Sequence, residues 1–131
     1  FIDSTEGLSE LKSGQIRSDA RRGYFIGLDG RRVIQKDEYY MLAGYLQNGE
    51  AVIMKLANIL WTEQADKEKI RYKQVNFVHD EWQTQVYDSM DAAERMGAIQ
   101  RESLVTAGEM VGCYCPLAGS TNIGFNWLET H

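Results

Sequence analysis

The stretch VNFVHDEWQTQV, Val75–Val86, decides how this chain is interpreted. Apolar and β-branched residues at both of its ends predict two strands. Between these strands the chain places His79, Asp80 and Glu81 next to one another. Asp and Glu are poor strand residues, and Asp is common in turns. We therefore expect a hairpin joined at Asp80-Glu81, with an imidazole and two carboxylates at its tip.

Three interpretations of this tip follow from its residue types. An exposed, solvated turn explains the two carboxylates without any function. A divalent metal site is the second interpretation, because Mg²⁺ prefers hard oxygen ligands and uses one or two carboxylates. Asp80 and Glu81 diverge in a tight turn, so we expect only one of them to bind metal directly. General acid–base chemistry is the third, with His79 as the titrating group.

Composition sets broad limits on the chain. Its 131 residues, 44% hydrophobic and 25% charged, are typical of one globular domain or of a piece of a larger one. The net charge of −5 is uneven, because residues 1–36 carry +2 and residues 37–131 carry −7. A simple nucleic-acid coat would be basic throughout. An acidic body with a basic patch suits a metal site, although composition alone favours a solvated acidic surface.

No apolar run reaches the roughly 18 residues that span a bilayer, and no signal peptide is visible. We expect no membrane partner. Cys113 and Cys115 are too few and too close for a disulfide framework, which favours reduced thiols in a cytosol-like compartment. The chain starts at Phe1 without Met, which we interpret as a fragment, a processed product or part of a split gene.

The first third of the chain predicts a helix and a hairpin. The helix is expected over residues 6–22, before Gly23. The pair Asp29-Gly30 is a hairpin turn signal, so Tyr24–Gly27 and Arg32–Gln35 are expected to pair as antiparallel strands.

The middle of the chain predicts one long helix. Apolar residues and one glycine recur at spacings of three and four, the period of a helix face. The members of this stripe are Tyr39, Leu42, Leu46, Gly49, Ile53, Leu56 and Leu60. We expect the stripe to face inward. Gly44 and Gly49 inside the helix suggest that another segment packs closely there.

The remaining elements complete a mixed fold. Strands are expected over residues 74–79 and 82–87, followed by a helix over about 90–109 capped by Asp88 or Ser89. The segment CYCPLA, residues 113–118, is expected to form a strand. Helices and strands are mixed, so the sequence predicts an α+β or α/β class.

Four segments resemble the family A DNA polymerases, in the family's order. VHDE between two apolar strands resembles motif C of the bacterial DNA polymerase I and T-seven-type phage enzymes. Ala20–Ile34 resembles the hairpin that follows the fingers and re-enters the palm. Leu46–Ala57 resembles the helix whose Gln reads the primer–template minor groove, and GFNWLETH resembles the C-terminal end of the phage-type branch. The resemblance covers residues 1–131 and implies an α+β palm segment, with a motif C hairpin packed on long helices.

The resemblance implies template-directed DNA synthesis, in which a primer 3′-hydroxyl attacks a dNTP with the help of two Mg²⁺ ions. Asp80 would be the metal ligand and, with Glu81, a catalytic residue. Trp127 is expected to anchor the C-terminal tail by burial. Contacts to DNA would come from His79, Gln47, Arg31, Arg32, Lys55 and His131. Ala43 stands where the family usually has Asn one turn before the Gln.

The family's other essential carboxylate, in motif A, and its fingers helix lie upstream of this chain. Asp3 mimics motif A, but no fingers helix separates it from the GLDGRR segment. The resemblance therefore implies a single C-terminal palm segment, inactive alone, in the cytoplasm of a bacterium or of a phage-infected host cell. Its partners would be primer–template DNA, dNTP and the upstream polymerase portion, on the same or a separate polypeptide.

Two alternatives remain. The chain could be a non-catalytic nucleic-acid-binding module with a palm-like fold. It could also be a metal-dependent hydrolase that uses Asp80, Glu81 and His79.

Overall fold

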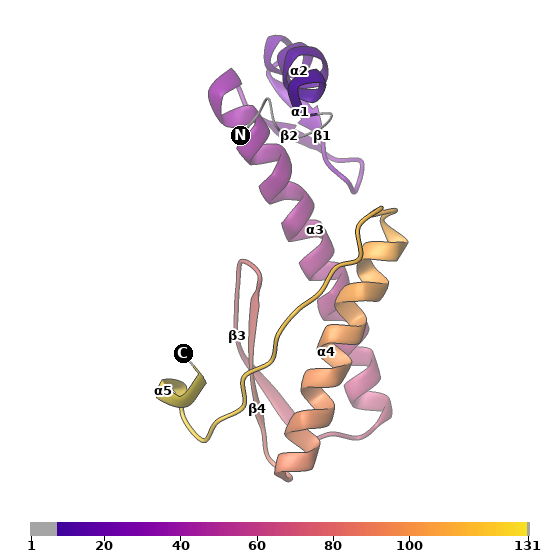
Figure 1. Ribbon diagram of the computed structural model, residues 1–131, viewed down its shortest axis with the longest axis vertical. Helices are drawn as coiled ribbons and strands as arrows, with labels where there is room; N and C mark the ends of the chain where they lie inside the picture. Colours follow the sequence, from indigo (N-terminus) through magenta and orange to yellow (C-terminus); the bar gives the residue numbers. More distant parts are fainter. Residues whose placement is uncertain (1–7, 131) are drawn as a thin grey trace. The chain divides into compact units, whose positions relative to one another are not determined.

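The computed structural model describes residues 8–130 and shows an α+β protein with long helices and two small antiparallel sheets (Figure 1). The α+β class expected from the sequence is confirmed. The chain divides into two compact units, Phe1–Val52 and Ile53–His131, and each is described by itself. No helix in the described part is long and apolar enough to cross a bilayer.

The first unit opens with a helical segment that ends at Gly23. Its parts are α1 (Leu8–Leu11), the π-helical turn η2 (Lys12–Ile16) and α2 (Arg17–Arg22). Gly23 adopts the left-handed conformation, with φ 77, and its N–H donates to the carbonyls of Asp19 and Ala20. Glycine is the usual residue there because it has no Cβ to clash. The predicted helix end is therefore confirmed, whereas its predicted start at residue 6 lies outside the described residues.

A short hairpin follows, made of β1 (Tyr24–Ile26) and β2 (Arg32–Ile34). The two strands pair antiparallel as predicted, although each is one residue shorter than expected at its far end. Gly30 carries the positive φ of the connection, at 78.

The core of the first unit forms around the fully buried ring of Phe25. Ile16 and Met41 are buried beside it, and the ring of Tyr45 lies 5.4 Å from that of Phe25. A Cβ added at Gly44 would meet the Phe25 ring at 3.6 Å, and one at Gly49 would meet Leu28 at 3.6 Å. Another segment lies against each of these helical glycines as predicted, but at ordinary van der Waals distance, so an added Cβ would fit.

The long helix α3 (Glu38–Lys67) forms as predicted, but its buried face differs from the predicted stripe. Leu46 is 60% exposed and Tyr39 is 83% exposed. The buried side chains are Met41, Met54, Ala57, Trp61 and Ala65. From residue 53 onward this face lies one position, about 100°, around the helix from the predicted one. Both series have helical spacing, and the large indole of Trp61 belongs to the series that is buried.

The second unit places a hairpin and a helix around the C-terminal half of α3. Its elements are β3 (Tyr72–Val78), β4 (Glu81–Val86), α4 (Met90–Met110) and α5 (Trp127–Thr130). The hydroxyl of Ser89 accepts a hydrogen bond from the N–H of Ala92, so the predicted cap of α4 is confirmed.

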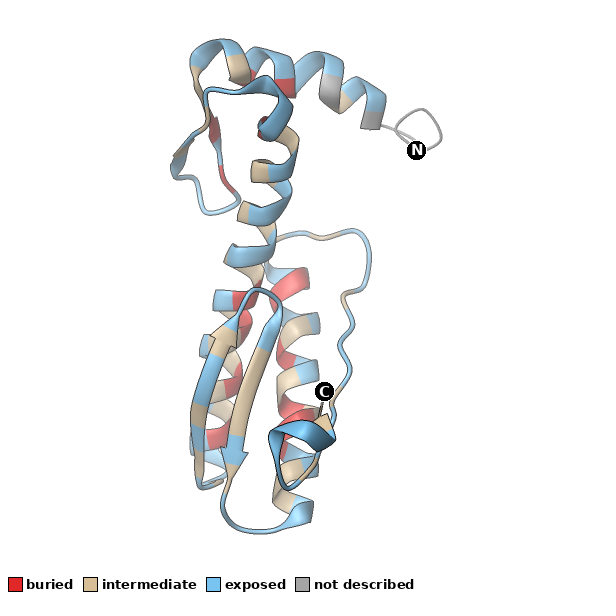
Figure 2. Cartoon of the chain, turned by 90° about the vertical axis from the view of Figure 1, so that its left-hand side faces the viewer, coloured by how far each residue is buried: buried red, intermediate tan, exposed pale blue. Residues whose placement is uncertain are grey.

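The buried residues of this unit, drawn in red in Figure 2, lie between α3 and α4, and the hairpin packs against them. Four of them form one hydrophobic cluster: Trp61, Ala65, Met96 and Ile99. The partly buried hairpin side chains packed on this cluster are Tyr72, Trp82 and Val86. This cluster holds the hairpin on the two helices.

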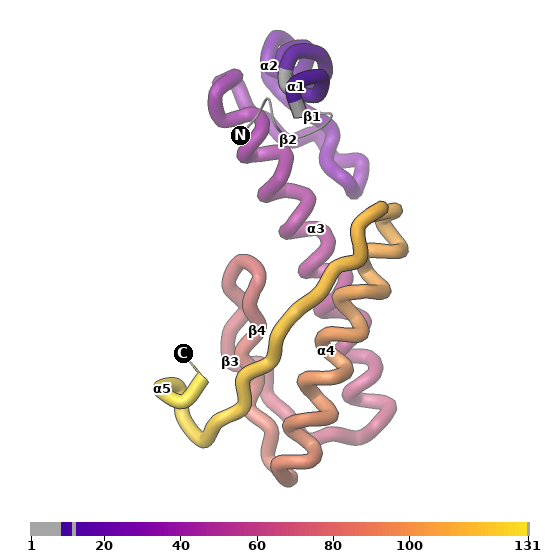
Figure 3. The backbone as a smooth tube through the Cα atoms, viewed as in Figure 1, coloured from indigo at the N-terminus to yellow at the C-terminus, as the bar shows by residue number. Residues whose placement is uncertain are grey.

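The chain after α4 runs along that helix as a tail without regular structure until α5 (Figure 3). A Cβ added at Gly108 would approach Leu117 to 2.8 Å, and one added at Gly97 would approach Thr121 to 2.5 Å. The side chain of Arg101 donates to the Thr121 hydroxyl at 2.6 Å. The tail therefore packs closely against α4 at these two glycines.

Two predictions about this tail are wrong. Residues 113–118 form no strand, because Pro116 has no N–H to donate and no described strand lies beside them to pair with. Trp127, expected to anchor the tail by burial, is 57% exposed.

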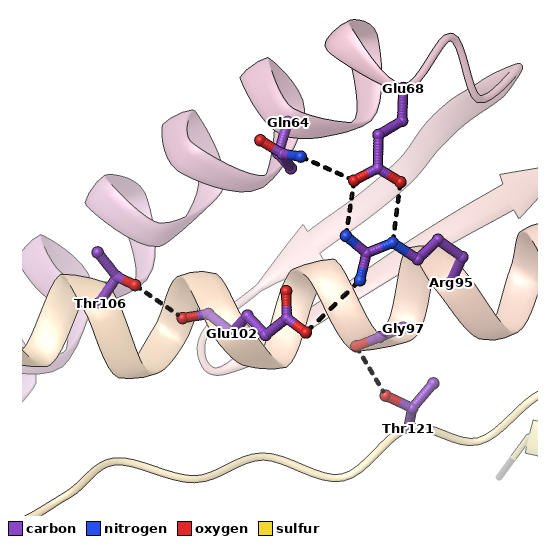
Figure 4. A network of polar contacts seen from close by, with 7 residues as sticks. All are labelled: Gln64, Glu68, Arg95, Gly97, Glu102, Thr106 and Thr121. Carbon is purple, nitrogen blue, oxygen red and sulfur yellow. Dashed lines mark hydrogen bonds and ion pairs between the residues drawn. The ribbon is translucent and has the colours of Figure 1, made fainter.

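An ion-pair network joins α4 to the C-terminal end of α3 (Figure 4). The guanidinium of Arg95, on α4, donates to both carboxylate oxygens of Glu68, just after α3, at 2.6 and 2.8 Å. Gln64 donates to the same carboxylate at 2.7 Å. The hydrogen bonds from Arg95 and then Gln64 lower the pKa of Glu68 from 4.5 to about 2. The network therefore ties the end of α3 to α4 when Glu68 is ionised.

Candidate active site

The tip of the β3–β4 hairpin is a two-residue turn made of His79 and Asp80. Val78 pairs with Glu81 across the strands, so Glu81 is the first residue of β4. The predicted turn at Asp80-Glu81 is therefore wrong by one residue. His79 was expected on a strand face, which is also wrong. A two-residue loop is the shortest common hairpin connection, and this register leaves room for only His79 and Asp80.

His79 adopts a left-handed backbone, with φ 52. Such values are uncommon for residues other than glycine, although His, Asn and Asp tolerate them better than most. Non-glycine residues held in sparse backbone regions cluster at active sites and ligand clamps, where the surrounding structure enforces them. The strain at this turn makes the hairpin tip a candidate site on physical grounds.

The two carboxylates of the tip differ in their surroundings. Asp80 is exposed and makes no hydrogen bond or ion pair with any of residues 8–130. Glu81 lies on the strand, where its carboxylate accepts a hydrogen bond from the side chain of Gln83 at 2.8 Å. Asp80 is therefore the carboxylate available to a ligand.

The donor set at the tip suits a hard cation but is incomplete. Carboxylate oxygens are the ligands that Mg²⁺ uses, together with water and phosphate oxygens. In the described part of the chain no three His, Cys, Asp or Glu side chains lie close enough to hold a metal ion. A complete metal site at Asp80 would need further oxygen donors from outside these residues.

The basic residues of the first hairpin are engaged within that unit. The guanidinium of Arg31 donates to the Asp29 carboxylate at 2.5 Å across the turn. Burial would raise the pKa of Asp29, but hydrogen bonds from the backbone and side chain of Arg31 outweigh it and lower that pKa below 3.8. Arg31, predicted as a phosphate ligand, thus already has an anionic partner.

Arg32 lies over the ring of Tyr24, with 5.2 Å from its guanidinium carbon to the ring centroid. Arg22 lies 5.1 Å from the same centroid. Each guanidinium gains a cation–π contact. Arg22 also pairs with the carboxylate of Asp19, whereas Arg32 has no ion pair with the described residues. Sequence reasoning missed Tyr24 and Arg22. The signal available was an aromatic residue at the first position of a strand bracketed by arginines.

The remaining candidates are placed individually. Gln47 and Lys55 are both exposed on α3, Gln47 in the first unit and Lys55 in the second. The contact of Gln47 with the DNA minor groove, which the resemblance implies, stays a prediction. His131 lies outside the described residues.

Comparison with known proteins gives one similarity relevant to this site. No protein-family model matches the chain. The chain is 32% identical to a DNA-directed DNA polymerase of Escherichia phage Phieco32, in an alignment of 119 residues that covers 86% of this chain. The matched region is 19% of the polymerase, so the chain spans about a fifth of that relative's length.

Proposed function

We propose that this chain is part of a DNA polymerase and supplies one metal-binding carboxylate, Asp80, to its active site. The observation that carries the proposal is the position of Asp80. It is exposed at the tip of a strained two-residue turn and has no partner among the described residues. The similarity of most of the chain to a phage DNA polymerase supports the same activity.

The chemistry proposed is transfer of a nucleotide from dNTP to a primer 3′-hydroxyl. Two Mg²⁺ ions, when bound, stabilise the attacking and leaving oxygens of the in-line displacement. One hairpin tip cannot surround two ions, so we infer that other carboxylates come from an upstream polymerase portion, on the same or another polypeptide. Asp80 would be the direct ligand. Glu81, already bonded to Gln83, would contribute less.

The proposed contacts to primer–template DNA come from both units. Gln47 is exposed on α3 and could offer both donor and acceptor to the minor-groove pattern that correct base pairs share. Arg32 and Lys55 are exposed cations suited to phosphate. Arg31 would have to exchange Asp29 for phosphate. His79 and His131 would lie near the primer end.

The proposed assignment as the C-terminal palm segment of a family A enzyme rests on the order of the resembling segments. A hydrolase that used only Asp80, Glu81 and His79 is less well supported, because in the described part of the chain these three side chains do not come together to hold a metal ion. A non-catalytic nucleic-acid-binding module would retain the Arg and Gln contacts without needing Asp80. The polymerase and the non-catalytic module therefore differ in whether the function needs Asp80.

The experiment is primer extension by the complete polymerase that contains this segment, with Asp80→Asn. Loss of a metal ligand that stabilises the transition state should lower the extension rate by at least about 10³-fold. Binding to primer–template, measured by fluorescence anisotropy, should persist. Asp91→Asn, which removes an exposed carboxylate in the first turn of α4, is the matched control and should extend normally.

Glu81→Gln should lower extension clearly less than Asp80→Asn, because Glu81 is the weaker ligand. Near-normal extension by Asp80→Asn would remove the catalytic proposal and favour the non-catalytic module.

A further inference from the structure

The face of the β3–β4 hairpin that packs on the helices has a polar layer between two apolar ones. Near the base of the hairpin Tyr72 pairs with Val86, and near the tip Phe77 pairs with Trp82. The cross-strand pair between them is polar: Gln74 and Thr84. Cross-strand partners point to the same side of a sheet, so both side chains of this pair face the helices.

Each member of the polar pair is bonded to a different helix. The amide of Gln74 donates to the side-chain oxygen of Asn58, on α3, at 2.8 Å. The hydroxyl of Thr84 accepts from the amide of Gln100, on α4, at 2.9 Å. Both bonds are partly buried. These four residues, which we call the cross-brace, join α3, β3, β4 and α4 at one level of the hairpin.

The cross-brace resists sliding of the hairpin along the helices. A buried amide without a partner costs more than its hydrogen bond contributes. A shift along the strands would bring Gln74 and Thr84 opposite other helix residues and leave Asn58 and Gln100 unpaired. Polar groups in an otherwise apolar face can specify register in this way.

A β-bulge follows the cross-brace directly. The strand register shifts between Gln74 and Asn76, and the bulged residue Val75 is 62% exposed. The bulge returns Phe77 to the side of the hairpin that faces the helices. Only three cross-strand pairs lie between the bulge and the turn. Bulges bend a strand and re-aim the residues beyond it, often next to active sites. The direction in which Asp80 points therefore depends on where the strand is fixed before the bulge.

We propose that Asn58, Gln74, Thr84 and Gln100 are positioning residues, which set the place of the Asp80 carboxylate through the hairpin. This inference rests on the proposed polymerase function. None of the four residues is proposed to touch a substrate. Displacement of a reacting group by about 1 Å can lower a rate about 100-fold, so a small shift of the tip is enough for a measurable effect.

The test compares two substitutions at Thr84 in the complete polymerase. Thr84→Val has a similar shape and high strand propensity but cannot accept the bond from Gln100. Thr84→Ser keeps the hydroxyl. Thr84→Val should lower kcat about tenfold, with KM for primer–template within about twofold, because a misplaced ligand weakens the transition state and not DNA binding. It should also raise the Mg²⁺ concentration needed for half-maximal extension. Thr84→Ser should leave both kcat and this Mg²⁺ concentration close to those of the original chain.

Two further variants separate positioning from stability. Val86→Ala removes apolar contacts from the same hairpin face and leaves the cross-brace intact, so it should lower the melting temperature but leave kcat nearly normal below that temperature. Gln74→Met breaks the other arm of the brace on the other strand. It should repeat the effect of Thr84→Val, and it tests the proposal if Thr84→Val does not fold.

Unchanged kcat and Mg²⁺ dependence in Thr84→Val and Gln74→Met would overturn the cross-brace proposal. An equal loss of kcat in Val86→Ala would overturn it too, because stability alone would then explain the effect. Failure of the polymerase proposal is distinguishable, since Asp80→Asn would then extend primers normally.

Discussion

The two hairpins of this chain are both antiparallel, but the first has shorter strands and the two tips differ. In the first, Gly30 takes the left-handed backbone and Asp29 pairs with Arg31. In the second, a histidine takes the left-handed backbone, and the next residue, Asp80, has no partner in the described part of the chain. In the first tip, the carboxylate thus has a cationic partner, and a glycine takes the positive φ without strain. The second keeps a strained backbone and an available carboxylate, the combination expected where a turn is kept for binding.

The largest difference between the hairpins should appear when their buried rings are removed. Phe25 is fully buried under the first hairpin, whereas Trp82 is half-buried under the second. Phe25→Ala should lower the free energy of unfolding by about 3–5 kcal/mol, since it leaves a large cavity. Trp82→Ala should cost less. Urea unfolding followed by circular dichroism measures both.

Tryptophan fluorescence is a useful second signal in that experiment, because all three tryptophans belong to the second unit. Equal costs for the two variants would mean that the second hairpin is anchored as deeply as the first.

Adding a side chain at Gly30 and removing the one at His79 should change stability in opposite directions, because both residues have a left-handed backbone. Gly30→Ala meets no neighbouring atom within 4 Å, so its cost is backbone strain alone, about 1–2 kcal/mol. His79→Gly relieves similar strain but adds about 0.5–1 kcal/mol of chain entropy to the unfolded state. The histidine variant should therefore be slightly more stable than the original chain. Thermal unfolding of both variants checks the signs, and two changes of the same sign would contradict the contrast.

The smallest effect should come from the ion pair that closes the second unit. The folded-state pKa of Glu68 is lowered from 4.5 to about 2 by Arg95 and Gln64. Its stabilisation is therefore fully present above pH 4.5 and is lost as the pH falls towards about 2. The difference in unfolding free energy between the original chain and Glu68→Gln should be constant above pH 4.5 and shrink below it.

The control for this pH series is Asp29→Asn in the first hairpin. The pKa of Asp29 is lowered in the same direction, so its contribution should also fade in acid, beginning from a lower pH near 3.8. A Glu68→Gln difference that stays the same from neutral pH into acid would show that the ion pair with Arg95 does not form in solution.

Local signals in the sequence predicted much of this fold. Gly23 and Ser89 mark helix ends through conformations and hydrogen bonds that involve only neighbouring residues. The first hairpin was predictable from Asp29-Gly30 for the same reason. The turn of the second hairpin was misplaced by one residue, because its register depends on which strand residues pack on the helices. That information is tertiary.

The inward face of α3 shows a similar limit. Apolar residues with helical spacing occur on two overlapping faces, and spacing alone does not choose between Leu46 or Leu60 and Trp61 or Ala65. The tail failed for a different reason. Alternating residues around Cys113 indicated a strand, but a strand needs a partner, and partners are not encoded locally.

For the candidate site, the sequence supplied Asp80 and its neighbours but not their surroundings. The exposed acidic tip was predictable from residue types. The cross-brace was not recognised, because glutamines such as Gln74 and Gln100 are usually surface residues, and only the packed structure shows them bonded to Asn58 and Thr84.

The close packing of the C-terminal tail against Gly97 limits which substitutions this sequence can accept during evolution. Position 97 can hold no side chain while Thr121 lies 2.5 Å from where its Cβ would be. Two positions far apart in the gene are therefore constrained to change together. In a homologue with a larger residue at position 97, the C-terminal tail should follow a different path over α4. The residues at positions 97 and 121 therefore indicate whether a homologue keeps this path of the tail.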